Sequence, residues 1–300
     1  TVYPYLAGGI LLFGALLLYE TRLMRRKGDP VLPIQLMGRP TYLLTVLLGM
    51  FSGAILASVI FLPAYVEQVL GVEASKAGYF YTPLALASGV GAAGGGALVD
   101  RRGPTVTMII ASILAVVGAA LFPLWVTQTW QMFVASCILG VGFGIMLGAP
   151  INVLATEDTQ DQKGVALGTI SLFRQIGMTI APAIYSGFIA RAFLSIGDRI
   201  KERFEEQGMN VSGGQAGQLD QMADMSYQDM IAQVEAIPVP AVRDTILGAI
   251  QDAVTSGYAG LYWAAAAVSG LTLAVSLLLA AVRGRRPASA AEPAPAKPVG

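Results

Sequence analysis

The sequence predicts an all-α integral membrane protein. Three observations favour this class: the composition, the apolar segments of membrane length, and the gathering of basic residues between alternate segments. Of the 300 residues, 55% are hydrophobic and only 13% are charged, and the mean hydropathy is +0.63. Because a soluble domain carries about a quarter charged residues, this surplus indicates lipid-facing and helix-packing surface.

The apolar segments account for the predicted helices in order. A helix needs about 20 mostly apolar residues to cross a bilayer. The chain contains segments of this kind at 2–19, 42–68, 78–99, 105–127, 131–155, 165–193 and 258–282. The first is slightly short, and we expect the chain to be the C-terminal part of a longer protein.

Basic residues predict how these segments are oriented, because cytoplasmic loops carry the excess of Lys and Arg. Segment 20–41, the turn at 100–103 and the tail 283–300 are rich in arginine and lie on one side. Loop 194–257 lies on the other side and holds four basic and ten acidic residues. We therefore expect a cytoplasmic C-terminus and an extracytoplasmic 194–257 loop in a cell (inner) membrane.

A charged turn joins the third and fourth segments. The stretch from Gly96 to Gly103 resembles the loop signature of the major facilitator superfamily, G-x-L-A-D-R-x-G. It matches that pattern at Gly96, Leu98, Asp100, Arg101 and Gly103. The basic pair that follows in the family is absent, since Pro104 and Thr105 stand there.

This resemblance implies a domain organisation. A superfamily half has six helices with the signature between its second and third, so residues 42–282 correspond to the C-terminal half. Residues 1–19 then form one extra transmembrane helix, followed by a basic cytoplasmic connector at 20–41. An extra helix before the half is similar to the fourteen-helix drug:proton antiporters. The implied partner is an N-terminal transporter half, and the residues 283–300 are expected to be a disordered cytoplasmic tail.

The residue types at the signature turn suit a conformational gate. The Asp100 carboxylate can accept hydrogen bonds from N-terminal amides of the neighbouring helix. Arg101 and Arg102 can bridge to carboxylates of the other half, in contacts that form when the cytoplasmic side closes. Gly103 permits the tight turn. The alternative is that these charges only signal topology.

Arg174 is the only basic residue deep within a predicted span, and Gln175 follows it. A charge inside lipid costs several kcal/mol, so Arg174 should face a water-filled cavity or a carboxylate. The resemblance implies substrate contact, proton coupling or closure against the other half. The alternative is an arginine that snorkels to the interface.

Three other polar residues are cavity or coupling candidates. Glu67, after Tyr65 at the outer end of its span, is either a cation or proton site at the cavity mouth or a solvated end residue. Asn152, after Pro150, either lines the cavity or caps a kinked helix.

The 194–257 loop shows two amphipathic patterns. Ile196, Ile200 and Phe204 are spaced to prolong the preceding helix, and a new helix is expected to begin at Pro240. We expect a small helical hairpin on the outer rim, serving either as a passive spacer or as a gating or partner-binding element.

The functional expectation is a secondary transporter that exports small lipophilic compounds by proton-driven alternating access in the lipid bilayer. An enzyme is disfavoured, because no hydrolase, protease or Walker pattern occurs. Histidine is absent and Cys137 is the only cysteine, so zinc sites of the Cys/His kind are excluded. We also expect no other metal, no cofactor and no nucleic acid partner. The alternative is a non-transporting membrane scaffold or sensor.

Overall fold

The computed structural model describes residues 34–157, 162–206 and 227–284, together with positions 8, 11, 14 and 15. Every regular element in these ranges is a helix, and six helical segments are long and apolar enough to cross a membrane. The predicted all-α half-bundle is therefore confirmed. The extra helix at 2–19 (apart from those four positions), most of the connector and the tail from residue 285 lie outside the described residues.

The six membrane-length segments overlap the six predicted spans from 42 to 282, and four of them consist of two or three successive helices. The helices are α2 (Ile34–Met37), α3 (Pro40–Val59), α4 (Leu62–Gln68), α5 (Ala74–Ala77), η1 (Gly78–Tyr81), α6 (Thr82–Arg102), α7 (Pro104–Trp125), α8 (Thr129–Leu147), α9 (Ala149–Thr156), α10 (Lys163–Leu194), α11 (Ile196–Glu206), α13 (Tyr227–Glu235) and α14 (Pro240–Gly284). Proline stands at the first turn of α3, α4, α6, α7 and α9, where its missing N–H costs nothing.

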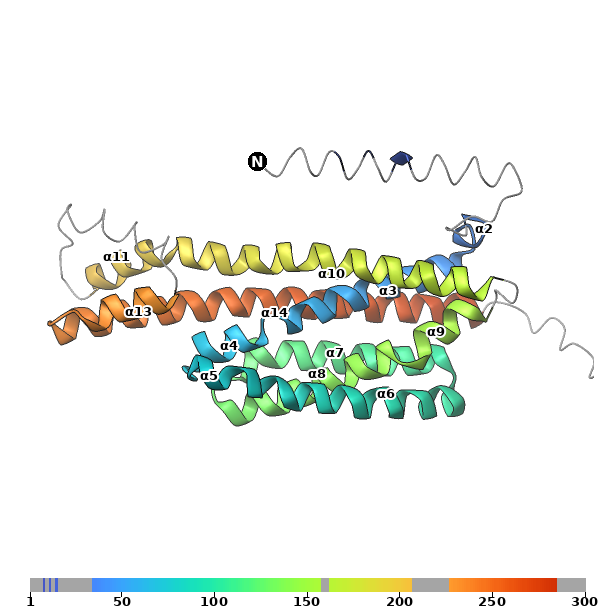
Figure 1. Ribbon diagram of the computed structural model, residues 1–300, viewed down its shortest axis with the longest axis horizontal. Helices are drawn as coiled ribbons and strands as arrows, with labels where there is room; N and C mark the ends of the chain where they lie inside the picture. The colour runs from blue at the N-terminus through green and yellow to red at the C-terminus, as the bar shows by residue number, and fades with distance from the viewer. Residues whose placement is uncertain are drawn as a thin grey trace, which may run out of the picture.

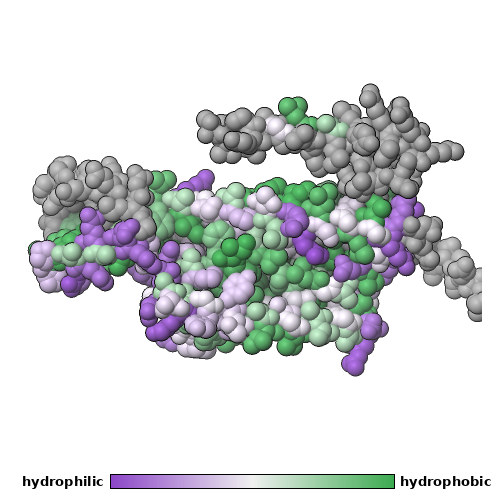
Figure 2. All heavy atoms as spheres, in the orientation of Figure 1, coloured by the Kyte–Doolittle hydropathy of each residue, from purple (hydrophilic) through white to green (hydrophobic). Residues whose placement is uncertain are grey.

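The bundle consists of two groups of three long helices, drawn one above the other in Figure 1. One group contains α3, α10 and α14, and the other contains α6, α7 and α8; α7 packs against α14 and joins them. We call the end that carries Gly103 and Arg283 the motif end. We call the opposite end, where α11 and α13 lie, the hairpin end. Figure 2 shows hydrophobic side chains over the middle of the bundle and hydrophilic ones mostly near its two ends.

Glycines set how closely the helices of each group approach. A Cβ atom at Gly144 of α8 would overlap the backbone carbonyl of Ser88 on α6, and one at Gly53 of α3 would overlap that of Arg174 on α10. By contrast, Gly89 and Gly96 have no atom within 4 Å of the place where a Cβ would lie. The first kind of glycine therefore allows packing within the half, whereas the second kind lies on surface that the described residues leave open.

This difference predicts opposite effects of the same substitution. Gly144→Ala should destabilise the protein by about 1–3 kcal/mol, since the new methyl group forces α6 and α8 apart. Gly89→Ala on α6 should be neutral or stabilising by about 0.5–1 kcal/mol, because alanine is the better helix former. Thermal unfolding of the two purified variants in detergent checks this, and shifts of the same sign and size would contradict it.

The hairpin end differs from the prediction in one respect. Residues 240–257 belong to the last membrane helix itself, because α14 runs unbroken from Pro240 to Gly284 over 45 residues. At 1.5 Å per residue it is about 68 Å long, roughly twice the hydrocarbon thickness of a bilayer. The predicted separation of this helix from the last span is wrong, because no proline interrupts the chain between them.

The extension of α14 is covered by α11 and α13. Ile200, Met230 and Ile250 are completely or almost completely buried in this contact, so the predicted apolar faces do pack together. An ion pair between Arg203 and Asp252 closes its edge, and Arg199 donates to the Ser256 hydroxyl at 3.0 Å. Residues 207–226, between the two short helices, lie outside the described residues.

Candidate functional site

The signature residues form the last turn of α6 rather than a separate turn. Asp100, Arg101 and Arg102 are helical and exposed. The chain reverses at Gly103 alone, which has φ +80° and donates its N–H to the Val99 carbonyl at 2.8 Å. The two arginines are favourable at a helix C-terminus and the aspartate is not. The turn is thus tighter than predicted, and glycine suits it because other residues rarely adopt positive φ.

The expected hydrogen bonds from α7 amides to Asp100 do not occur. Helix α7 begins at Pro104, which has no N–H to donate. Among the described residues Asp100 has neither an ion pair nor a hydrogen bond. The motif end of α6 therefore has a free surface for a further contact. It consists of the Asp100 carboxylate, the two exposed arginines and the open surface at Gly96.

Arg174 lies in α10, eleven residues after Lys163, which is about 16 Å along the helix. The backbone there is fixed by the close crossing with α3, where Gly53 meets the Arg174 carbonyl and Gly177 meets the Met50 carbonyl. The side chain is half-buried, but its Nε and Nη2 atoms are buried and have no hydrogen-bond partner among the described residues.

Among the described residues the Ser136 and Tyr262 hydroxyls are also buried without a partner, but only Arg174 carries a charge. Each unsatisfied buried donor costs about 1–3 kcal/mol, and the cost is higher for a charged group. Gln175, next to Arg174, is exposed on the same helix. This stretch of α10 therefore offers hydrogen-bond donors and a positive charge at membrane depth.

Asn152 lies at the kink of the membrane segment Thr129–Thr156. Its Nδ2 donates to the Gly148 carbonyl at 3.2 Å, four residues back, where α8 ends and α9 begins. The side chain is also exposed. Of the two readings of Asn152, capping a kinked helix is the one that the geometry supports directly.

Tyr65 is a core residue. Only 3% of it is exposed, and its ring packs edge-on against Phe122, Tyr258 and Tyr262 at 5.4–5.6 Å between centroids. Its hydroxyl donates to the Val126 carbonyl at 3.4 Å. The cluster ties α4, α7 and α14 together, and its four rings flank a small pocket of about 40 Å³.

Glu67 belongs to the hairpin end. Its Oε1 accepts a hydrogen bond from Gln228 of α13 at 2.9 Å, and Tyr227 donates to the Gln68 carbonyl at 3.3 Å. Burial, and to a lesser extent the Glu67 carboxylate, raise the pKa of Tyr227, so this hydroxyl stays a neutral donor at physiological pH. Glu67 therefore anchors α13 to α4.

The predicted site residues are thus spread over the bundle. The signature residues and Asn152 lie toward the motif end, Arg174 is deep within α10, and Glu67 and Tyr65 lie toward the hairpin end. Within the described ranges no three His, Cys, Asp or Glu side chains are placed to hold a metal ion.

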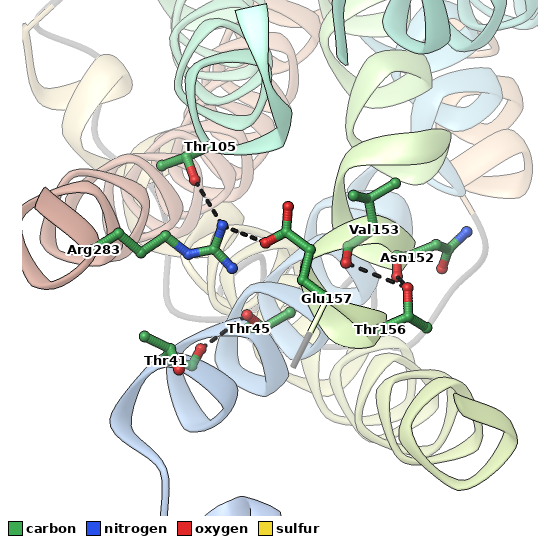
Figure 3. A network of polar contacts seen from close by, with 8 residues as sticks. All are labelled: Thr41, Thr45, Thr105, Asn152, Val153, Thr156, Glu157 and Arg283. Carbon is green, nitrogen blue, oxygen red and sulfur yellow. Dashed lines mark hydrogen bonds and ion pairs between the residues drawn. The ribbon is translucent and has the colours of Figure 1, made fainter. Parts of the chain in front are cut away.

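A polar contact at the motif end was missed by the sequence reasoning (Figure 3). Arg283, at the end of α14, pairs with Glu157 at 2.6 Å, and its Nη1 lies 3.4 Å from the Thr105 hydroxyl of α7. Arg283 was considered only as a topology signal. The sequence did hold one clue: Glu157 and Arg283 each follow a predicted membrane segment closely, and both segments end on the same side of the membrane.

Six membrane-length helices with a charged turn and a half-buried arginine define an integral membrane helical bundle. Comparison with known proteins agrees: residues 2–182 match the model of the Major Facilitator Superfamily. The chain belongs to the Major Facilitator Superfamily.

Individual relatives extend this comparison. The chain is 49% identical over 286 residues to an uncharacterized MFS-type transporter, YfiU, of Bacillus subtilis, covering 95% of this chain and 55% of that protein. It is 25% identical over 207 residues to the B. subtilis multidrug transporter protein MdtP, covering 68% and 38%. It is also 25% identical over 187 residues to a probable actinorhodin transporter of Streptomyces coelicolor, covering 60% and 32%. The chain spans about half the length, or less, of these curated relatives.

Proposed function

We propose that this chain forms the C-terminal half of a proton-coupled exporter of small lipophilic molecules. The observation that carries the proposal is Arg174, whose Nε and Nη2 atoms are buried in a membrane helix without a hydrogen-bond partner among the described residues. A soluble or purely structural bundle gains nothing from such a charge, because it costs several kcal/mol at membrane depth. A transporter gains a group that a substrate, a carboxylate or water contacts in one state and not in another.

In this proposal a second six-helix half supplies the missing contacts. Helices α6 and α10 are the least covered of the membrane segments, with 22% and 28% of their apolar windows buried. Helix α6 ends in the exposed residues Asp100, Arg101 and Arg102, and Arg174 lies on α10. Rocking of the two halves about a central site would make and break these contacts, which is alternating access.

The proposed orientation in the membrane rests on the distribution of charge, and the proposed substrate class rests on the relatives. The excess of acidic over basic residues in 194–257 and the arginines of the motif end favour a cytoplasmic motif end. Relatives named as multidrug transporters favour lipophilic substrates. The extra segment at 2–19 favours the fourteen-helix drug:proton antiporters, where additional helices separate the halves.

Efflux by the full-length protein tests this function. Energised cells that express it should lose a preloaded fluorescent lipophilic cation faster than cells with an empty vector, and a protonophore should abolish the difference. The orientation is checked in the same cells, in a Cys137→Ser background. A Val239→Cys variant should react with an impermeant maleimide, and a Gln162→Cys variant should not. Correct labelling without any efflux would favour the non-transporting scaffold.

A further inference from the structure

Helix α9 connects the two groups of helices at the motif end. The membrane segment Thr129–Thr156 runs with α6 and α7 as far as Leu147, and after Gly148 it turns across toward the other group (Figure 1). There α9 packs against α3 and α10, and it keeps contacts with α6, α7 and α8. Its buried side chains, Ile151, Leu154 and Ala155, are between 0% and 4% exposed. This short helix is therefore the part of the motif end that touches most of the bundle.

One end of α9 is built as a hinge. Helix α8 ends at Gly148, whose N–H donates to the carbonyls of Gly144 and Ile145 at 3.1 and 3.3 Å. Pro150 follows in the first turn of α9 and has no N–H to continue the ladder of α8. The Asn152 side chain bonds to the Gly148 carbonyl. Backbone hydrogen bonding between α8 and α9 is thus interrupted at one point, which is a usual site of bending in a long helix.

The other end of α9 is held by charge. Glu157 directly follows the helix, and its carboxylate pairs with Arg283 at 2.6 Å (Figure 3). The same Arg283 nitrogen lies within 3.4 Å of the Thr105 hydroxyl, so the contact joins α9, α14 and α7. The side chains of Arg283 and Glu157 are 24% and 38% exposed, which keeps the pair partly screened from water and stronger than a fully exposed one.

We propose that α9 is a hinged arm, with its pivot at Gly148–Pro150 and its tip latched by the Glu157–Arg283 ion pair. While the latch is closed, the arm binds the two helix groups together at the motif end. When the latch opens, the tip swings away and exposes the apolar face of the arm. Its role in opening and closing a transport pathway rests on the proposed function, but the hinge and the latch do not.

The experiment measures exposure of the arm without measuring transport. A Leu154→Cys reporter is placed in a Cys137→Ser background of the full-length protein, and its reaction rate with a membrane-permeant maleimide is followed in native membranes. Glu157→Gln and Arg283→Gln should each raise this rate about tenfold, the loss expected for one charge-assisted hydrogen bond. Arg283→Lys keeps the charge and should stay close to the parent, and the swap Glu157→Arg with Arg283→Glu should restore the parent rate.

Two controls separate release of the arm from general loosening. A Leu139→Cys reporter in α8, where Leu139 is 1% exposed, should stay unreactive in the same variants. Glu73→Gln breaks an exposed ion pair with Lys76 away from the motif end and should change neither reporter. An unchanged Leu154→Cys rate in both latch variants, or an equal rise at Leu139→Cys, would overturn the proposal whether or not the protein shows efflux.

Discussion

Replacing Arg174 with alanine should reduce efflux to background, a loss of more than about tenfold. The guanidinium lies deep in α10 with two buried nitrogens that the described half leaves unpaired, so its partner has to be water, a substrate or the other half. Arg174→Lys should retain part of the activity, because it keeps the charge and loses the bidentate geometry. Efflux of a fluorescent lipophilic cation at matched membrane levels measures both variants.

The stability of the same variants separates a functional from a structural arginine. Removing an unpaired buried charge should leave the free energy of unfolding unchanged or raise it by about 1–3 kcal/mol. Arg191→Ala serves as the control, since Arg191 is exposed in the last turn of the same helix and should be neutral in both assays. An Arg174→Ala protein that unfolds easily, or one that transports like the parent, would contradict the cavity assignment.

The second large effect is expected from Asp100→Asn, which should abolish efflux without impairing the fold. Asp100 is exposed and has no hydrogen bond or ion pair among the described residues, so we expect the bundle not to depend on it. At the C-terminal end of α6 its charge opposes the helix dipole, and asparagine should even stabilise that helix by about 0.3–1 kcal/mol. The expected loss therefore comes from a contact made elsewhere, in only one of two conformations.

The comparison variant is Asp198→Asn, because Asp198 is an exposed acidic residue at the hairpin end whose side chain is 87% exposed. It should leave efflux and thermal stability unchanged. Parent-level efflux in Asp100→Asn at equal expression would reduce Asp100 to a topology signal.

The membrane helices could be predicted from the sequence, because an apolar run of membrane length directly favours a helix that crosses the bilayer. The segments from 42 to 282 all appear as membrane-length helices. The helix at Pro240 was predicted, but its continuation into the last span was not, since the polar residues in 240–257 indicated a separate helix outside the membrane. They remain helical because α11 and α13 cover their apolar face, a contact between segments distant in the chain.

The candidate site was only partly predictable for the same reason. The depth of Arg174 follows from its position within an apolar run. The aromatic contacts of Tyr65 and the Glu157–Arg283 pair depend on which helices become neighbours. Helix order along the chain does not specify those neighbours, because α3 packs with α10 and α14 rather than with α6.

The reactivity of a cysteine at position 174 shows whether Arg174 faces water in a pathway shared by the two halves. In a Cys137→Ser background, Arg174→Cys is exposed to a charged, impermeant methanethiosulfonate reagent on both sides of the membrane. Trp263→Cys, on the 48% exposed Trp263 of α14, serves as the lipid-facing comparison. The account predicts reaction at position 174 and none at 263. An unreactive Arg174→Cys from both sides would contradict it.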